Sequence, residues 1–235
     1  MIKITPLLLI LFLFSGISHA NLLKSGFNAE YDVNYNGIEL GVSKRNLSFK
    51  DAQHATYESS TIPEGFAALL IKETVKETSH LTITHKQIQP TLYNSTKDKK
   101  GQIETHQLEF DWDKNNFTNS YLKTTESLSP NTHDLLSFQL SIMQNLQNNI
   151  KNMQYRIATK KHTRTYNLYF LQKEKLQTEL GEFEVVKLES GKIKGNSKFT
   201  FWCAPALEYL PIKIQKVNDK GDKFSFSLRA FSVNK

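Results

Sequence analysis

FTFWCAPALEYLPIKIQKV, residues 199–217, is the stretch that decides how this chain folds. It holds one of the two tryptophans, the only cysteine and two of the six prolines of a 235-residue chain. Apolar residues alternate on both sides of a corner that contains Pro205. Such alternation is typical of two β-strands, and a proline is tolerated at the start of a strand, where Pro211 lies. The stretch therefore predicts a packed β architecture and not a catalytic centre.

Cys203 is the one residue of this stretch that invites a catalytic interpretation. In a strand it shares its face with Phe199 and Phe201, so its thiol is expected to be a small buried hydrophobic group. A single cysteine also excludes an intramolecular disulfide, so stability has to come from the core.

The same strand-and-turn pattern covers most of the remaining chain. Ala29, Tyr31 and Val33 alternate ahead of an Asn36-Gly37 turn, and a shift of apolar parity near residues 43–44 predicts a bulge there. We count ten to twelve short strands separated by turn signals, with no internal repeat and no domain boundary. The expected fold is mainly β (α+β), with a curved antiparallel sheet or open half-barrel in one domain, residues 21–235.

One helix is predicted, within residues 132–149, with Thr132 as its N-cap and Asp134 in its first turn. We expect it to be packed in the concavity of the sheet. Its apolar stripe has helical spacing; it is typical of a core, and the alternative is that it lines a lipid cavity together with Trp202. The candidate cavity-lining residues are Leu136, Leu140, Met143, Leu146 and Trp202.

The first 20 residues have the pattern of a cleavable secretory signal. Lys3 precedes an uncharged apolar run over residues 7–14, and Ser18 and Ala20 are small residues at the positions that a signal peptidase reads. The run is shorter than the ~20 residues that span a bilayer. We therefore expect cleavage after Ala20, export to the periplasm and a mature chain without a transmembrane helix.

The sequence carries none of the common catalytic or nucleotide-binding motifs, and its six histidines beyond residue 20 do not have the spacing of a metal site. We therefore expect no catalytic, cofactor-binding or metal-binding residues, and no nucleic-acid partner. Glu208, between two apolar residues, is expected to be structural. The net charge of +7 suits an anionic partner such as a lipid headgroup, or it simply keeps the protein soluble.

Several local patterns together resemble the exported bacterial family known as domain of unknown function 3108. They are YDVNYNGI from Tyr31, FDW from Phe110, DLLS from Asp134, GEFEVVKL from Gly181, and FWCAP with LPIKI from Phe201 and Leu210. The resemblance implies a periplasmic protein of a Gram-negative bacterium and supplies no catalytic residues. The expected fold of the chain is also similar to that of periplasmic lipoprotein carriers of the LolA and LolB type, in which a curved sheet surrounds an apolar cavity.

Three functions follow as hypotheses. The leading one is non-catalytic binding of a lipid, a lipoprotein or another amphipathic envelope ligand. The second is an assembly or scaffold protein that binds another envelope protein, and the third is an envelope hydrolase. An apolar cavity between the sheet and the helix would favour the first, and an exposed apolar patch or an unpaired sheet edge would favour the second.

Overall fold

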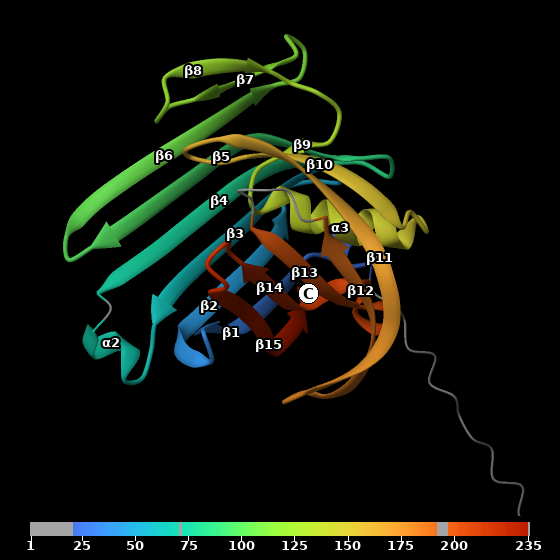
Figure 1. The fold of residues 1–235 in the computed structure, drawn as a ribbon. Coiled ribbons are helices and arrows are strands. Elements are labelled where there is room, and N and C mark those ends of the chain that lie inside the picture. The colour runs from blue at the N-terminus through green and yellow to red at the C-terminus, as the bar shows by residue number, and fades with distance from the viewer. Residues whose placement is uncertain (1–20, 71, 192–196, 235) are drawn as a thin grey trace, which may run out of the picture.

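The computed structural model describes residues 21–70, 72–191 and 197–234, so the predicted signal segment lies outside the described residues. A single curved sheet of 15 strands dominates the fold (Figure 1). Its order is β8-β7-β6-β5-β4-β3-β2-β1-β15-β14-β13-β12-β11-β10-β9, and each neighbouring pair is antiparallel except β9 with β10. The predicted fold class, a mainly β protein with a curved, unclosed antiparallel sheet, is confirmed.

The first half of the sheet is a meander that follows the chain from β1 to β8. Each strand pairs with the next because short turns connect them. Its strands are β1 (Phe27–Tyr35), β2 (Ile38–Phe49), β3 (His54–Pro63), β4 (Glu73–Ile83), β5 (Ile88–Lys99), β6 (Gln102–Asp111), β7 (Asn116–Asn119) and β8 (Thr124–Ser127).

The second half runs back from β9 to β15, and β15 pairs with β1 at the centre of the sheet. The stretch quoted first forms the β13–β14 hairpin, with the short 3-10 helix η1 (Pro205–Leu207) at its corner. The strands are β9 (Thr132–His133), β10 (Asn152–Ala158), β11 (Thr163–Thr178), β12 (Gly181–Ser190), β13 (Lys198–Ala204), β14 (Leu210–Val217) and β15 (Lys223–Val233).

Helix α3 (Ser137–Gln147) lies within the concavity of the sheet, and the two short helices are α1 (Leu22–Ser25) and α2 (Ala67–Leu70) (Figure 1). The predicted helix exists but begins five residues later than Thr132. Thr132 and His133 instead pair with β10, and Asp134 caps the helix, because its Oδ1 accepts from the backbone N–H groups of Leu136 (2.7 Å) and Ser137 (2.9 Å).

The bulge in the first hairpin lies at Leu40 and not at residues 43–44, because Val33 pairs with Gly41 while Asn34 pairs with Glu39. Gly41 is needed beside it: its φ is +151°, and a Cβ there would lie 2.1 Å from the carbonyl oxygen of Ile62. No larger residue fits this approach without a shift of the backbone.

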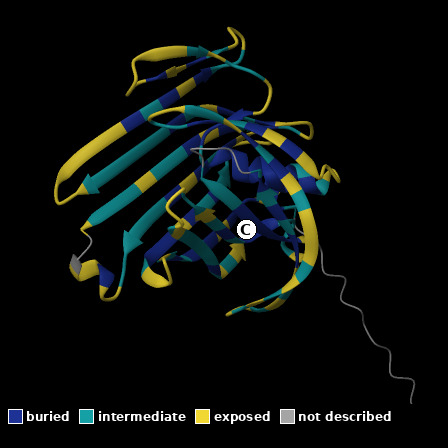
Figure 2. Cartoon of the chain, in the orientation of Figure 1, coloured by how far each residue is buried: buried dark blue, intermediate teal, exposed yellow. Residues whose placement is uncertain are grey.

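The buried apolar residues form two clusters. Figure 2 shows that α3 and the strands around it are largely buried. One cluster is centred on β1–β6 and includes Leu136, Leu140 and Met143 of the segment around α3. The other joins Phe138, Ile142 and Leu146 to β10–β14. The helix therefore contacts both halves of the sheet with different faces, as a helix buried on nearly every side has to do.

Side chains connect the two ends of the sheet where the backbone ladder stops. Arg156 of β10 donates from Nη2 to Glu126 of β8 (3.0 Å) and from Nη1 to the carbonyl oxygen of Ser127. Asn119 of β7 donates to the carbonyl oxygen of Thr159 (3.1 Å). The sheet is therefore open in its backbone pairing and is held in a barrel-like shape by these contacts.

Candidate functional site

A cavity of about 170 Å³ lies between the inner face of the sheet and the start of α3. One side is formed by β2–β4 and the other by β13–β15, so segments far apart in the sequence meet around it. Its lining residues are Arg45, Ser59, Thr61, Glu77, Leu135, Leu136, Phe138, Gln139, Phe199, Ile214, Lys216, Phe224 and Phe226.

Strand register brings the polar part of this lining together. Ala29 pairs with Arg45, Arg45 with Ser59, and Ser59 with Glu77, across four neighbouring strands. Residues directly opposite one another point to the same face of a sheet. The row therefore faces the cavity, and the residues next to it along each strand face outward.

Arg45 is the most unusual residue of the cavity, because its side chain is a buried charge. Its exposure is 6%, and its guanidinium lies over the rings of Tyr31 (4.5 Å) and Phe226 (5.0 Å). Nη1 donates to Oε1 of Gln139 on α3 (2.5 Å), whereas Nε has no hydrogen-bond acceptor among the described residues. A buried N–H of a charged group without an acceptor is costly, and this one borders the cavity.

Glu77 is the acidic group of the cavity. It accepts a hydrogen bond from the hydroxyl of Tyr93 (2.5 Å). Burial raises the pKa of its carboxyl, although Tyr93 and the nearby positive charge of Arg45 reduce the shift. The cavity thus holds a fixed positive group beside a carboxyl that takes up a proton more readily than usual.

A second buried polar cluster, next to the cavity, is explained by the capping of α3. Oδ2 of Asp134 accepts from the hydroxyl of Ser79 (2.7 Å), and burial raises the pKa of Asp134. Burial lowers the pKa of the neighbouring His133 to about 3, so this histidine is neutral. These groups hold the start of the helix against β4 and do not border the cavity.

A path of aromatic rings leads from Arg45 to the turn that joins β1 and β2. The ring of Phe226 lies 5.5 Å from that of Phe224, which lies 6.5 Å from the partly exposed ring of Tyr35. On the other side, Lys216 has its Nζ 5.8 Å from the ring of Phe199. Burial and the charge of Arg164 lower the pKa of Lys216.

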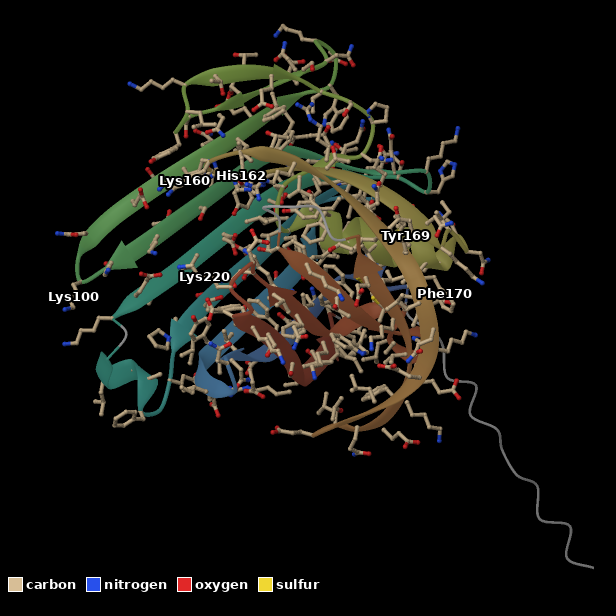
Figure 3. The ribbon with its side chains drawn as sticks, viewed as in Figure 1. Lys100, Lys160, His162, Tyr169, Phe170 and Lys220 are labelled. Carbon is tan, nitrogen blue, oxygen red and sulfur yellow. The ribbon has the colours of Figure 1, made fainter. Side chains whose placement is uncertain are left out.

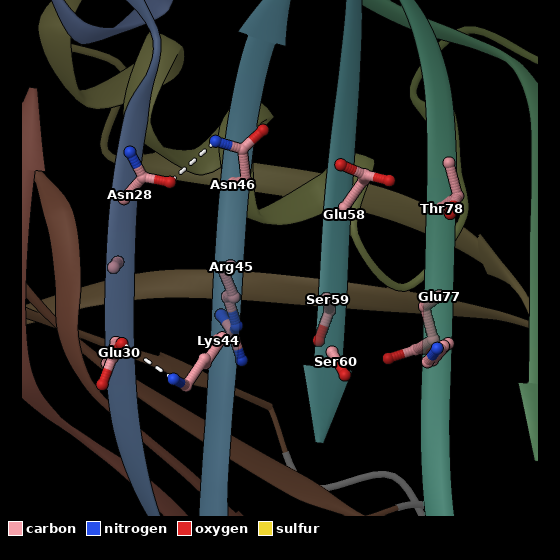
Figure 4. Close-up of a pocket in the computed structure, with 12 residues that line it drawn as sticks. Asn28, Glu30, Lys44, Arg45, Asn46, Glu58, Ser59, Ser60, Glu77 and Thr78 are labelled. Atoms are coloured by element: carbon pink, nitrogen blue, oxygen red, sulfur yellow. Dashed lines mark hydrogen bonds and ion pairs between the residues drawn. The ribbon is translucent and has the colours of Figure 1, made fainter. Parts of the chain in front are cut away.

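Larger hollows in the surface are more open and have other surroundings. One lies on the outer face of β1–β4, where Asn28, Asn46, Glu30 and Lys44 form a polar surface (Figure 4). Nζ of Lys44 lies 3.4 Å from Glu30 there. It shares β2–β4 with the inner cavity but presents solvated charges, so it lacks the apolar walls that are typical of ligand sites.

Of the five residues proposed from the sequence to line a cavity, Leu136 borders this one. Leu140, Met143 and Leu146 are buried in the two clusters and are not among its lining residues. Trp202 lies on the opposite face of β13 from Phe201 and Cys203; its indole N–H donates to Oε1 of Glu174 (2.6 Å).

Cys203 is fully buried and clusters with Phe201, and burial raises the pKa of its thiol well above the usual range. The interpretation of this cysteine as a core residue is confirmed. Glu208 has a structural contact, since its Oε2 accepts from Nε2 of Gln147 at the end of α3 (3.0 Å). Among the described residues, no group of three or more His, Cys, Asp and Glu side chains is arranged to share a metal ion.

Sequence reasoning missed the charged residues of the cavity, Arg45 and Glu77. The position of Arg45 in the strand could have been used to find it. Arg45 lies two residues from both Ser43 and Leu47, which are fully buried, so the three side chains share the inner face of β2. Nothing in the sequence alone shows that β2 and β4 face β14 and β15 across a cavity.

Comparisons with known proteins identify one matching family and two solved structures that are similar to this chain. The family described as "Protein of unknown function (DUF3108)" matches residues 30–229. A beta-barrel-like protein of the DUF1849 domain from Brucella abortus is similar in structure, with a TM-score of 0.57 and 7% identity over 90% of this chain and 98% of that chain. A DUF1089 family protein from Pseudomonas aeruginosa has a TM-score of 0.41 and 10% identity over 72% and 87% of the two chains. No curated protein sequence matches this chain.

Proposed function

The chain belongs to the DUF3108 family of proteins of unknown function. We propose that it is a non-catalytic binding protein for an anionic amphipathic ligand. The ligand's acidic head accepts hydrogen bonds from Arg45, and its apolar chain follows Phe226 and Phe224 toward the mouth of the cavity. The observation that carries the proposal is the buried Nε–H of Arg45, which has no acceptor among the described residues and borders an apolar cavity.

The energetics of this arrangement are favourable at both ends of the ligand. A hydrogen bond to a charged group contributes roughly 1.5–3 kcal/mol, and here it also satisfies a donor that is otherwise buried alone. Each methylene removed from water contributes about 0.8 kcal/mol. The partly exposed rings of Phe199, Phe224 and Phe226 are the surface against which such a chain is buried.

The size of the cavity sets the class of ligand. A volume of about 170 Å³ is near the ~150 Å³ of an apolar protein cavity that holds one benzene molecule. It therefore accommodates the head and the first part of one chain, and not a whole two-chain phospholipid. A fatty acid or another single-chain amphiphile fits, with the rest of its chain passing over Phe224 and Tyr35.

The periplasm of a Gram-negative bacterium is the compartment that we propose. The signal-like residues 1–20 and the net charge of +7 support it, as both suit a protein that is exported and meets anionic envelope components. Among the described residues, no helix is long and apolar enough to cross a membrane.

A cavity-filling substitution tests the proposal. Thr61→Phe places a ring in the cavity without removing Arg45, and Ser60→Phe, the neighbouring residue on the outer face, is the matched control. Native mass spectrometry after gentle purification and displacement of a fluorescent fatty acid are the readouts. We expect one bound single-chain lipid in the wild type and in Ser60→Phe, and at least tenfold weaker binding in folded Thr61→Phe. A wild-type protein that is purified without lipid and takes up no probe would contradict the proposal.

A further inference from the structure

An exposed apolar tip lies at the ends of the strands, where β1 turns into β2 and β3 connects to β4. Phe66, just before α2, is 75% exposed, Leu69 is 70% exposed, and Ile38 at the start of β2 is 65% exposed. Scattered single apolar residues are common on protein surfaces, but these three belong to adjoining segments, because α2 packs against β2. We call this set the apolar tip.

The local structure shows why these side chains point to solvent. β3 ends at Pro63, and the backbone N–H of Glu64 donates to the carbonyl oxygen of Leu40 (3.3 Å), which holds the connection against β2. Ala67 is the buried residue of α2, with 7% exposure. Phe66 directly precedes α2, Leu69 lies within it, and both side chains are exposed. Figure 1 shows α2 beyond the ends of β3 and β4.

Three exposed lysines lie beside α2, next to the apolar tip. Lys72 follows α2, and its carbonyl oxygen accepts from the backbone N–H of Lys100 (3.1 Å), so the β5–β6 turn with Lys99 and Lys100 lies beside it. Figure 3 shows Lys100 at this outer end of the sheet. All three lysines are exposed, and none takes part in an ion pair among the described residues.

The carboxylates at this end are mostly engaged. Glu64 pairs with Arg229 (3.6 Å), Glu73 pairs with Lys97 (2.7 Å), and Asp98 accepts from the backbone of Gly101 (2.8 Å). Glu39 is the exposed acidic neighbour of Ile38. Asp98 keeps its charge in this hydrogen bond, and Arg229 is shared with Glu30 and Asp32. The positive charge at this end is therefore local to Lys72, Lys99 and Lys100, which have no ion-pair partner among the described residues.

We propose that the apolar tip and its lysines dock the protein on an anionic membrane surface. Apolar side chains flanked by lysines are the chemistry that binds the headgroup region of an anionic bilayer. A contact of three side chains is far below the roughly 800 Å² per partner of a stable protein interface, which favours a membrane over a second copy of the chain.

The position of the apolar tip agrees with this role. Tyr35 and Ile38 flank the same two-residue turn, and Tyr35 pairs with Phe224 at the mouth of the inner cavity. A bilayer that contacts the apolar tip thus lies next to the aromatic path into the cavity. The docking itself does not require that the cavity holds a ligand.

Co-sedimentation of the full chain with vesicles tests this proposal. Vesicles of phosphatidylethanolamine and phosphatidylglycerol are compared with vesicles of phosphatidylcholine at low and high salt. We expect binding to the anionic vesicles, weakened by salt. The double variant Phe66→Ser with Leu69→Ser should bind at least tenfold more weakly, and Lys99→Gln with Lys100→Gln about fivefold more weakly for each lysine removed.

Matched variants elsewhere on the surface provide the controls. Tyr169→Ser with Leu171→Ser removes two exposed apolar residues of β11, and Lys50→Gln with Lys86→Gln removes two exposed lysines at the opposite end of the sheet. Both, and the cavity variant Arg45→Met, should bind vesicles as the wild type does. Equal losses in the controls, no binding to anionic vesicles, or self-association that the tip variant abolishes would each overturn the proposal.

Discussion

At the scale of single residues, the cavity is defined by a guanidinium and a carboxyl. Arg45 supplies the guanidinium, and burial raises the pKa of the Glu77 carboxyl near it. An anionic head beside Arg45 also lies near Glu77, and a second negative charge raises the pKa of a carboxyl further. Ligand binding and protonation of Glu77 are therefore expected to be coupled.

This coupling predicts a pH dependence of affinity. Binding of decanesulfonate, whose head stays anionic, should take up a proton and should strengthen as pH falls from 8 toward 5. Glu77→Gln should bind more tightly at neutral pH and lose the pH dependence, while Glu58→Gln, on the outer face of β3, should behave as the wild type does. Calorimetry in buffers of different ionisation enthalpy measures the proton uptake; none in the wild type would contradict the coupling.

His133 predicts acid destabilisation. Its folded-state pKa is about 3 because it is buried as the neutral imidazole, whereas an unfolded histidine titrates near 6.5. Its contribution to stability is present above pH 6.5 and is lost as pH falls toward 3, by roughly 3 kcal/mol at pH 4. The raised pKa of Asp134 acts in the opposite direction.

Urea denaturation at pH 7 and pH 4 checks this prediction. His133→Gln should lose less stability than the wild type does on acidification, and His85→Gln, at an exposed position, serves as the control. An unchanged loss in His133→Gln would show that another group is responsible.

At the scale of elements, α3 joins the two apolar clusters. Leu140 is fully buried against the first cluster. Leu140→Ala should lower the free energy of unfolding by about 2–5 kcal/mol, whereas Leu171→Ala on the exposed surface of β11 should change it by less than about 0.5 kcal/mol. Urea denaturation of both variants measures the difference; similar values would show that the helix does not organise the core.

The β2–β3 pair contains a glycine, Gly41, at which two backbones approach closely. Gly41→Ala places a Cβ 2.1 Å from the oxygen of Ile62, whereas Gly37→Ala, also at positive φ (+84°), meets nothing within 4 Å. Gly41→Ala should therefore lower the melting temperature clearly more than Gly37→Ala, which carries only the strain of its φ, about 1 kcal/mol. Equal shifts would contradict the close approach.

Sequence pattern predicted these elements unequally. The β13–β14 hairpin, the buried Cys203 and the helix were correct because each depends on local alternation. The start of the helix was wrong because Thr132 is a good N-cap by type, yet its backbone pairs with β10, far along the chain. Tertiary pairing thus outweighed a local capping preference.

At the scale of the whole molecule, the formation of the cavity depends on which strands meet across the concavity. A meander of short turns follows from the sequence, but the pairing of β1 with β15 and the contacts of Arg156 with β8 do not. These long-range contacts place Arg45 opposite Phe226 and create the cavity. The candidate site could therefore not be predicted from the sequence, although the fold class could.

The polar and the aromatic parts of the cavity lining contribute differently to the binding of an amphiphile. The lining includes the charged donor Arg45 at one place and Phe224 at another, and Phe224 contacts Tyr35, which pairs with Ile38 of the apolar tip. A single-chain amphiphile from a bilayer would meet apolar groups first and the guanidinium last. We therefore expect Arg45 to distinguish specific binding of an amphiphile from simple apolar adsorption.

Calorimetric titration of decanesulfonate into the wild type, Arg45→Met and Lys44→Met tests this central claim most directly. Lys44 precedes Arg45 in β2, faces outward and is 56% exposed, so its removal tests for unspecific charge effects (Figure 4). We expect saturable binding of one ligand to the wild type and to Lys44→Met, and at least tenfold weaker binding to folded Arg45→Met. Wild-type affinity in Arg45→Met, or equal losses in both variants, would contradict it.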